Sequence, residues 1–179
     1  PAIGTIAWAT GPGTCRALRR AGLAPQQIVA PPADAPQFDS EALWARVGDD
    51  VRPGQRVLIV RGSDAGGRAA GRDWLGEQLA GAGVVVDRVL AYRRRAPVWT
   101  AGQHALALAA ASDGSWWLFS SSEAIGNLQR SLPDEGWRGA RALATHPRIA
   151  TRAREAGFGV VCESRPTLAE LVASIKSSG

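Results

Sequence analysis

Short apolar runs alternate with segments of helical periodicity along most of this chain of 179 residues. The run Arg56-Val-Leu-Ile-Val-Arg61 is the clearest, because a short β-branched stretch that enters a glycine-rich turn is typical of a buried strand. Comparable runs predict strands at residues 5–10, 27–30, 84–91, 116–119 and 160–162. The periodic segments between them predict helices near residues 13–21, 41–47, 69–80, 101–111 and 122–131, and a last helix opened by Thr167.

Strands that alternate with helices favour an α/β fold, in which parallel sheets are covered by helices. Ligands of such folds bind at the carboxyl ends of the strands, where loops and helix N-termini gather. The loops of most interest are therefore those after Thr10, Arg61, Phe119 and Thr145.

Residues 5–23 and 140–158 follow the same pattern. At one constant offset Thr10 corresponds to Thr145 and Pro12 to Pro147, and each copy predicts a strand, a tight turn, a helix and a glycine stop. Two copies so far apart indicate two similar α/β domains, and two such domains form a cleft between them.

The repetition is incomplete, because the segments 56–90 and 116–130 have no second copy. The chain also contains no methionine, so Pro1 is not a natural start. We therefore expect that sequence is missing at the front.

The formal net charge is +5, and nearly all of the positive charge is arginine. A solvated basic surface, an acidic ligand or a nucleic acid would each suit this charge. The arginines are spread among acidic residues without a stacking-aromatic motif, so we expect no nucleic-acid partner. No apolar run has the length of a membrane span or resembles a signal peptide, which favours a cytoplasmic protein without a membrane partner. The scattered cysteines and histidines have no metal-binding spacing, so we expect no metal.

Three turns carry candidate chemistry. Gly11-Pro-Gly-Thr14 presents backbone N–H groups and a hydroxyl at a helix start, which suits either an anion or simple capping. The loop that begins with Arg61 and Gly62 is rich in glycine and can face an anion, but it lacks the Lys-Ser/Thr pair of a phosphate loop. Ser120, Ser121 and Ser122 can cap a helix or face a ligand, and no base is visible that would make one of them a nucleophile.

Tyr92 is the only tyrosine of the chain. It ends a predicted strand beside three arginines, near the expected domain junction. It is either an ordinary core or surface residue or a phenol that donates a proton or hydrogen bond to a departing group.

Taken in order, several motifs resemble the uroporphyrinogen-III synthase family. They are Ala9-Thr-Gly-Pro-Gly-Thr-Cys15, Arg61-Gly followed by Gly71-Arg-Asp-Trp-Leu75, Val89-Leu-Ala-Tyr-Arg93, Phe119-Ser-Ser-Ser-Glu-Ala-Ile125 and Pro166-Thr-Leu-Ala-Glu-Leu171. The resemblance implies two flavodoxin-like domains joined by a short connector. Residues 1–90 would form domain two without its N-terminal part, residues 91–97 the connector, and residues 98–179 domain one without its first strand and helix.

The resemblance also implies an activity. Members of the family cyclise hydroxymethylbilane, a linear tetrapyrrole, to uroporphyrinogen III. The terminal hydroxyl leaves as water to give an azafulvene, and the last ring is inverted before closure. The reaction uses no metal and no organic cofactor, and the resemblance implies a monomer. We expect weak or absent activity for a form that lacks part of each sheet.

The family's functional positions map onto residues of this chain. Tyr92 would assist the loss of the hydroxyl, and Thr14 would act beside it. The substrate carboxylates would meet Gly11, Gly13, Thr14, Arg61, Gly62, Ser120, Ser121, Ser122, His146 and Arg148. In the family the last of these turns usually reads Gly-Pro-Thr-Thr-Ala, whereas here it is His146-Pro-Arg-Ile-Ala150, so cationic and donor groups replace hydroxyls.

Two other readings of the sequence remain open. The same two domains would also suit a non-catalytic binding module for an acidic small molecule. A nucleic-acid-associated α/β domain is the third reading, and it would be retained on DNA in a salt-dependent way.

Overall fold

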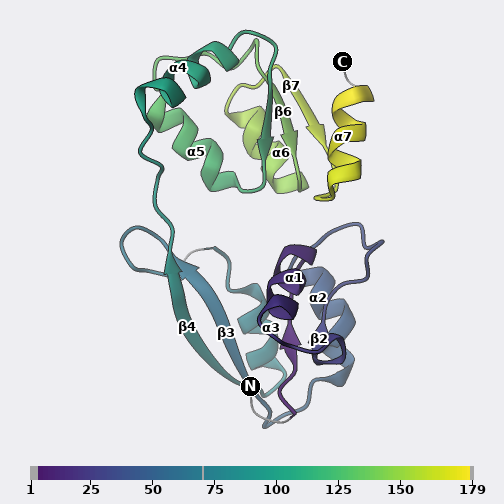
Figure 1. The fold of residues 1–179 in the computed structure, drawn as a ribbon. Coiled ribbons are helices and arrows are strands. Elements are labelled where there is room, and N and C mark those ends of the chain that lie inside the picture. The colour runs from purple at the N-terminus through teal and green to yellow at the C-terminus, as the bar shows by residue number, and fades with distance from the viewer. Residues whose placement is uncertain (1–3, 70, 178–179) are drawn as a thin grey trace. The chain divides into compact units, whose positions relative to one another are not determined.

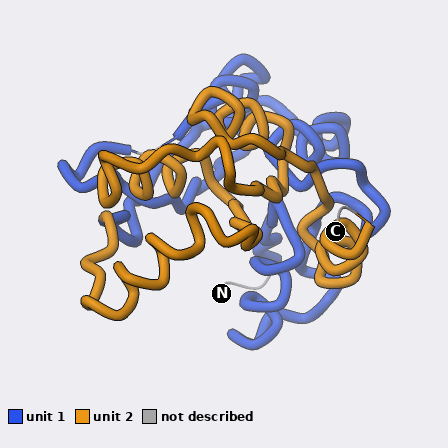
Figure 2. The backbone as a smooth tube through the Cα atoms, turned by 90° about the horizontal axis from the view of Figure 1, so that it is seen from above, with its two compact units in different colours: residues 1–95 blue, residues 96–179 orange. Residues whose placement is uncertain are grey.

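The computed structural model describes residues 4–69 and 71–177. The chain divides into two compact units, Pro1–Arg95 and Ala96–Gly179 (Figures 1 and 2). Every strand pair of the described residues is parallel, and helices connect the strands, which confirms the α/β fold class. The limits 1–90, 91–97 and 98–179 for domains and connector, and the cleft, stay predictions.

The described residues of unit 1 form two separate two-stranded parallel sheets (Figure 1). One pairs β1 (Ala7–Trp8) with β2 (Ile28–Val29), and the other pairs β3 (Arg56–Ser63) with β4 (Val85–Arg93). Its helices are α1 (Pro12–Arg20), α2 (Ser40–Val47) and α3 (Trp74–Gly81), with short 3-10 turns at Pro25–Gln27 and Gly48–Asp50.

The core of unit 1 lies against one face of the β3–β4 pair. Val57 and Ile59 of β3 pack against a buried cluster that includes Leu79 of α3. The alternate residues Leu58 and Val60 are each 60% exposed. Because successive side chains of a strand point to opposite faces, β3 has an inner face toward this core and an outer face away from it.

Unit 2 holds one parallel sheet in the order β5 (Trp116–Phe119), β6 (Arg141–Ala144), β7 (Val160–Glu163). Its helices are α4 (Ala101–Ala110), α5 (Ser122–Ser131), α6 (Pro147–Glu155) and α7 (Leu168–Ser177). Ala142, Leu143 and Ala144 of the central strand are 0% exposed. Burial of consecutive residues means that both faces of β6 are covered, as expected for a central parallel strand.

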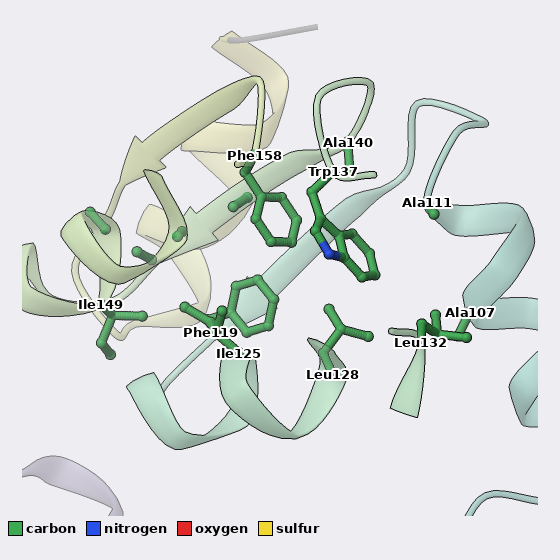
Figure 3. Packing of buried hydrophobic residues seen from close by; sticks show 14 residues of the cluster. Ala107, Ala111, Phe119, Ile125, Leu128, Leu132, Trp137, Ala140, Ile149 and Phe158 are labelled. Carbon is green, nitrogen blue, oxygen red and sulfur yellow. The ribbon is translucent and has the colours of Figure 1, made fainter. Parts of the chain in front are cut away.

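Aromatic rings fill the core of unit 2 (Figure 3). Phe158 packs edge-on against Phe119, with ring centroids 5.5 Å apart, and stacks on Trp137 at 5.2 Å. Trp117 meets Trp137 edge-on at 5.6 Å. These contacts join the end of β5 to the loop before β6 and the loop after α6.

Several element boundaries differ from the sequence prediction: β1 covers only Ala7–Trp8 of the strand predicted at residues 5–10, and β3 runs past Arg61 to Ser63. The helix predicted from about residue 69 begins only at Trp74, because Gly71 takes a positive φ of 85°, which an α-helix excludes. Before it, the N–H of Arg68 donates to the Asp64 carboxylate at 2.9 Å, and Gly67 takes a positive φ of 80°. In addition, β4 runs to Arg93 rather than ending at 91.

Among residues 4–69 and 71–177, no helix combines the length and apolar character that a bilayer span requires.

Candidate functional site

The carboxyl end of the β3–β4 pair carries a β-bulge. The register is continuous from Arg56 to Arg61, which pairs with Leu90, but the next pair is Gly62 with Tyr92. Ala91 is therefore the extra residue of β4. Bulges change which way the following side chain points, and they occur often beside active sites.

The bulge decides on which face Tyr92 lies. Paired residues of a parallel ladder share a face, so Tyr92 lies on the outer face with Gly62 and Val60. With an unbroken register, Tyr92 would follow Leu90 onto the inner face. Outward placement leaves Tyr92 56% exposed, so its phenol is accessible.

The ring of Tyr92 covers Gly62, which is buried. A Cβ added at Gly62 would lie 2.4 Å from Cε2 and 2.6 Å from Cζ of Tyr92, closer than atoms can approach. The guanidinium carbon of Arg94 lies 6.0 Å from the ring centroid, at the limit of a cation–π contact. Glycine at position 62 therefore makes the observed position of the ring possible.

Arg61 faces the other way and is engaged within unit 1. Its Nη1 donates to Asp73 Oδ1 at 2.8 Å, and its Nη2 donates to the carbonyl oxygens of Gly71 and Arg72 at 3.0 and 3.2 Å. The side chain is only 13% exposed. These contacts give Arg61 a structural role, and binding of a substrate carboxylate by Arg61 stays a prediction.

The Gly-Pro turn that opens α1 is partly exposed. Gly11 is the N-cap residue and, having no side chain, gives the first turn no side-chain cap. Gly13 and Thr14 are exposed, and nothing lies within 4 Å of where a Cβ of Gly13 would be. The first turn of α1 therefore presents N–H groups beside the Thr14 hydroxyl, an arrangement that suits an anion.

In unit 2 the serine turn follows β5. Ser121 is the N-cap of α5, where its Oγ accepts from the N–H of Ala124 at 3.2 Å. Ser120 and Ser122 are exposed and Ser121 is half-buried. Ser121 thus has the capping role that the sequence offered as one alternative, while its two neighbours have accessible hydroxyls.

The histidine turn follows the adjacent strand, β6. Its N-cap is His146, whose Nδ1 accepts from the N–H of Arg148 at 3.1 Å. Because Nδ1 is the acceptor, the proton of the neutral ring is on Nε2, which stays a donor. Thr145 bridges the two turns, since its Oγ1 donates to the Phe119 carbonyl at 3.3 Å.

Within each unit the structure brings some predicted residues together. In unit 1, Tyr92 contacts Gly62, and Arg61 lies next to them in sequence on the opposite face. In unit 2, the serine turn and the histidine turn follow the paired residues Phe119 and Ala144, so they lie at one edge of the sheet. The roles of these residues in binding and catalysis stay predictions.

Asp73 is the residue of this region to which the sequence analysis assigned no role. It is the N-cap residue of α3, yet its side chain makes no capping hydrogen bond. It accepts instead from Arg61 and Arg88, which come from the two neighbouring strands. The sequence shows Asp73 near a predicted helix, with Gly76 three residues later. It does not show that Arg61 and Arg88 bind this carboxylate, because that depends on how their strands pair.

The loop before α3 is also tied to α2. Arg72 donates to the carboxylate of Glu41, in the first turn of α2. This hydrogen bond holds the pKa of Glu41 below its ordinary value. Among the described residues, no three His, Cys, Asp or Glu side chains gather in a way that would hold a metal ion.

A comparison with known families and structures bears on the whole chain. The family model described as uroporphyrinogen-III synthase HemD matches residues 2–173. A similar solved structure is a mutant uroporphyrinogen III synthase from the extremely thermophilic bacterium Thermus thermophilus, with 19% sequence identity and a TM-score of 0.47. That match covers 96% of this chain and 64% of the other, so this chain spans less than two thirds of that protein's length. Because the family model extends over nearly all of its residues, this chain belongs to the uroporphyrinogen-III synthase HemD family.

Proposed function

We propose that this chain acts in tetrapyrrole biosynthesis by cyclising hydroxymethylbilane to uroporphyrinogen III, as a lyase that releases water. The match of the HemD family model over residues 2–173 carries this proposal. We further propose that the chain works as a cytoplasmic monomer without a nucleic-acid partner.

In this proposal Tyr92 acts at the first step. The leaving group is a hydroxyl, which departs more easily when a neighbouring acid donates a proton or hydrogen bond to it. The phenol of Tyr92 is an O–H donor on an exposed position at a strand end. Donation of the proton to the hydroxyl releases water and leaves the azafulvene. The last ring attacks it through the α-carbon that already carries a methylene bridge, which gives a spiro intermediate. The bond from this carbon to the bridge then breaks, the bridge rejoins the ring at its other α-carbon, and the proton lost there replaces the one that the phenol donated.

Each unit supplies its own donors for the acidic side chains of the substrate. In unit 1 these are the N–H groups of the first α1 turn and the hydroxyl of Thr14. In unit 2 they are the hydroxyls of Ser120 and Ser122 and the exposed guanidinium group of Arg148. The net charge of +5 favours the approach of a poly-acid.

Positioning is the main requirement of the reaction, because a flexible linear molecule must close with one ring turned over. Fixing several carboxylates at once restricts the substrate to few conformations. This effect needs no metal and no organic cofactor, and the proposal includes none.

The test is the isomer that the chain produces from hydroxymethylbilane, identified chromatographically after oxidation to the porphyrin. We expect the type III isomer, whereas closure without inversion gives type I. Tyr92→Phe keeps the ring over Gly62 and removes only the hydroxyl, so we expect turnover to fall by about 100-fold with the fold intact.

Two results would contradict the proposal. Tight binding of the tetrapyrrole with no type III product would indicate a binding module rather than an enzyme. Type III formation at the original rate in Tyr92→Phe would remove this phenol from the mechanism and leave the cyclase activity itself in place.

A further inference from the structure

We propose that Asp73 is a positioning residue, which holds the ends of β3 and β4 in the bulged register that places Tyr92 on the outer face. The consequence for catalysis rests on the function proposed above. The geometric part of the inference concerns unit 1 alone and does not depend on that function.

Asp73 joins the two strands through one carboxylate. Its Oδ1 lies 2.8 Å from Nη1 of Arg61, the last residue of β3 before the bulge. Its Oδ2 lies 2.8 Å from Nη2 and 3.0 Å from Nε of Arg88 in β4. Each oxygen thus holds a guanidinium group from a different strand, and charge-assisted bonds of this kind are stronger than neutral ones.

The carboxylate of Asp73 binds the two arginines and does not cap its own helix. Aspartate at an N-cap position normally accepts a hydrogen bond from the first turn of its helix. Asp73 occupies the N-cap of α3 without any such bond. Its orientation toward the strands is therefore specific rather than a by-product of helix capping.

Space for the pair is provided by Gly76 of α3. A Cβ at Gly76 would lie 2.7 Å from Nη2 of Arg88 and 2.8 Å from Oδ1 of Asp73. Any larger residue would therefore press on the ion pair. With a larger residue at this position, the side chain of Arg88 or Asp73 would have to shift.

The ion pairs act on the strands at the point where the register changes. Arg61 and Arg88 lie on the inner face, one on each strand, and the bulge comes directly after Arg61 in β3 and at Ala91, three residues after Arg88, in β4. Beyond the bulge, Gly62 can accept the ring of Tyr92 on the outer face. Asp73 thus lies on the face opposite the ring and acts on it through the strand backbones.

A second ion pair between the same strands provides a matched control. Arg56 Nη2 lies 2.8 Å from Asp87 Oδ2, so this pair also joins β3 to β4. It lies at the other end of the ladder, where the register is unbroken, and its side chains are 73% and 51% exposed. Removing the Arg56–Asp87 ion pair weakens the contact between β3 and β4 but leaves the residues at the bulge unchanged. It therefore shows whether the loss of any ion pair between these strands moves Tyr92.

The experiment uses the single tyrosine as a probe. The chain is labelled with 3-fluorotyrosine, so that its fluorine spectrum contains one protein resonance, that of Tyr92. We expect Asp73→Asn to shift or broaden this resonance, because two guanidinium groups then share one neutral amide. Asp87→Asn should leave the resonance at its original position. Arg88→Gln, which leaves the Arg61–Asp73 pair in place, should produce a smaller shift.

Three results would overturn the inference. An unchanged resonance in folded Asp73→Asn would show that the ring does not depend on this carboxylate. An equal shift in Asp87→Asn would show that any lost cross-strand pair has the same effect. Loss of the circular dichroism spectrum in Asp73→Asn would make Asp73 a residue of general stability instead.

Turnover gives a second readout. For an active chain we expect Asp73→Asn to lower kcat by about 100-fold, the usual cost of misplacing a catalytic group, with little change in KM. Asp73→Glu, which restores the charge, should recover part of kcat. If a protein that carries this chain together with the front segment expected to be missing forms no uroporphyrinogen III, the proposed function fails, while the fluorine spectra still decide the role of Asp73.

Discussion

The position of the Tyr92 ring depends on the absence of a side chain at Gly62. A β-carbon there would overlap Cε2 and Cζ of the ring, at 2.4 and 2.6 Å. The backbone of Gly62 does not have a positive φ, so alanine is allowed by its local conformation. The requirement for glycine at this position comes from the neighbouring strand and not from Gly62 itself.

Substitution of Gly62 by alanine is therefore expected to displace the ring of Tyr92. The fluorine resonance of a 3-fluorotyrosine-labelled chain should move, and any type III product should form at least about tenfold more slowly, because the phenol leaves its position. Gly81→Ala is the control, since nothing lies within 4 Å of a Cβ at Gly81. A Gly62→Ala chain with an unchanged resonance would mean that the ring does not rest on this glycine.

Sequence reasoning identified Tyr92 and Gly62 as candidates but could not pair them. Their contact depends on the register of two strands whose paired residues are far apart in the chain, and on the extra residue Ala91. A period-two pattern without the bulge puts Tyr92 on the wrong face. Arg61 is a similar case, because the partners that engage its guanidinium group lie beyond a loop whose path the pattern did not predict.

At the scale of elements, the helices that follow β1, β5 and β6 begin in different ways. The α5 helix is capped by the hydroxyl of Ser121 and α6 by the imidazole of His146, whereas α1 begins at Gly11 without a side-chain cap. A capped first turn has already satisfied one of its N–H groups, and an uncapped one leaves more donors for a ligand. Both α1 and α6 begin with a proline, which has no N–H, but α6 also uses the N–H of Arg148 in its cap, so of these two turns the α1 turn is the stronger candidate for an anion.

Loss of the imidazole cap should destabilise α6. His146→Ala leaves the N–H of Arg148 without its acceptor, so we expect the free energy of unfolding to fall by about 1 kcal/mol. His146→Asn provides another acceptor at the same position and should retain most of the stability. Urea unfolding followed by tryptophan fluorescence gives the comparison. If the alanine and asparagine variants were equally stable, the hydrogen bond from the Arg148 N–H to His146 would not contribute to the stability of α6.

The bounds of helices and strands could be predicted from the sequence where neighbouring residues determine them. The strand at 116–119 and the helix at 122–131 lie where the sequence predicted them, because an apolar run ends in serines that cap the next helix. The start of α3 was predicted too early, since Gly71 has a positive φ of 85° and the chain enters the helix only at Trp74. The hydrophobic periodicity of the sequence does not predict where the loop before α3 ends and the helix begins.

At the scale of the molecule, the two units have cores of different size. The main hydrophobic cluster of unit 2 contains the aromatic residues Phe119, Trp137 and Phe158 (Figure 3). Each of them is at most 6% exposed. The cluster of unit 1 is built around the buried residues Val51, Leu79 and Val84, with the other members only partly buried. Because burial of apolar surface is the main favourable term in folding, local stability should differ between the units.

Hydrogen exchange of the whole chain, read by mass spectrometry, tests this difference. We expect backbone amides of β6, whose Ala142–Ala144 segment is fully buried, to exchange more slowly than those of β3, which has an exposed outer face. A difference of about 1.4 kcal/mol in opening free energy corresponds to about tenfold in exchange, and we expect at least that. Phe158→Ala should remove most of the slower exchange of β6 and leave β3 unchanged, because this ring packs against Phe119 and Trp137 in the core of unit 2. Equal protection of β3 and β6 in the unmodified chain would mean that apolar burial does not determine local stability here.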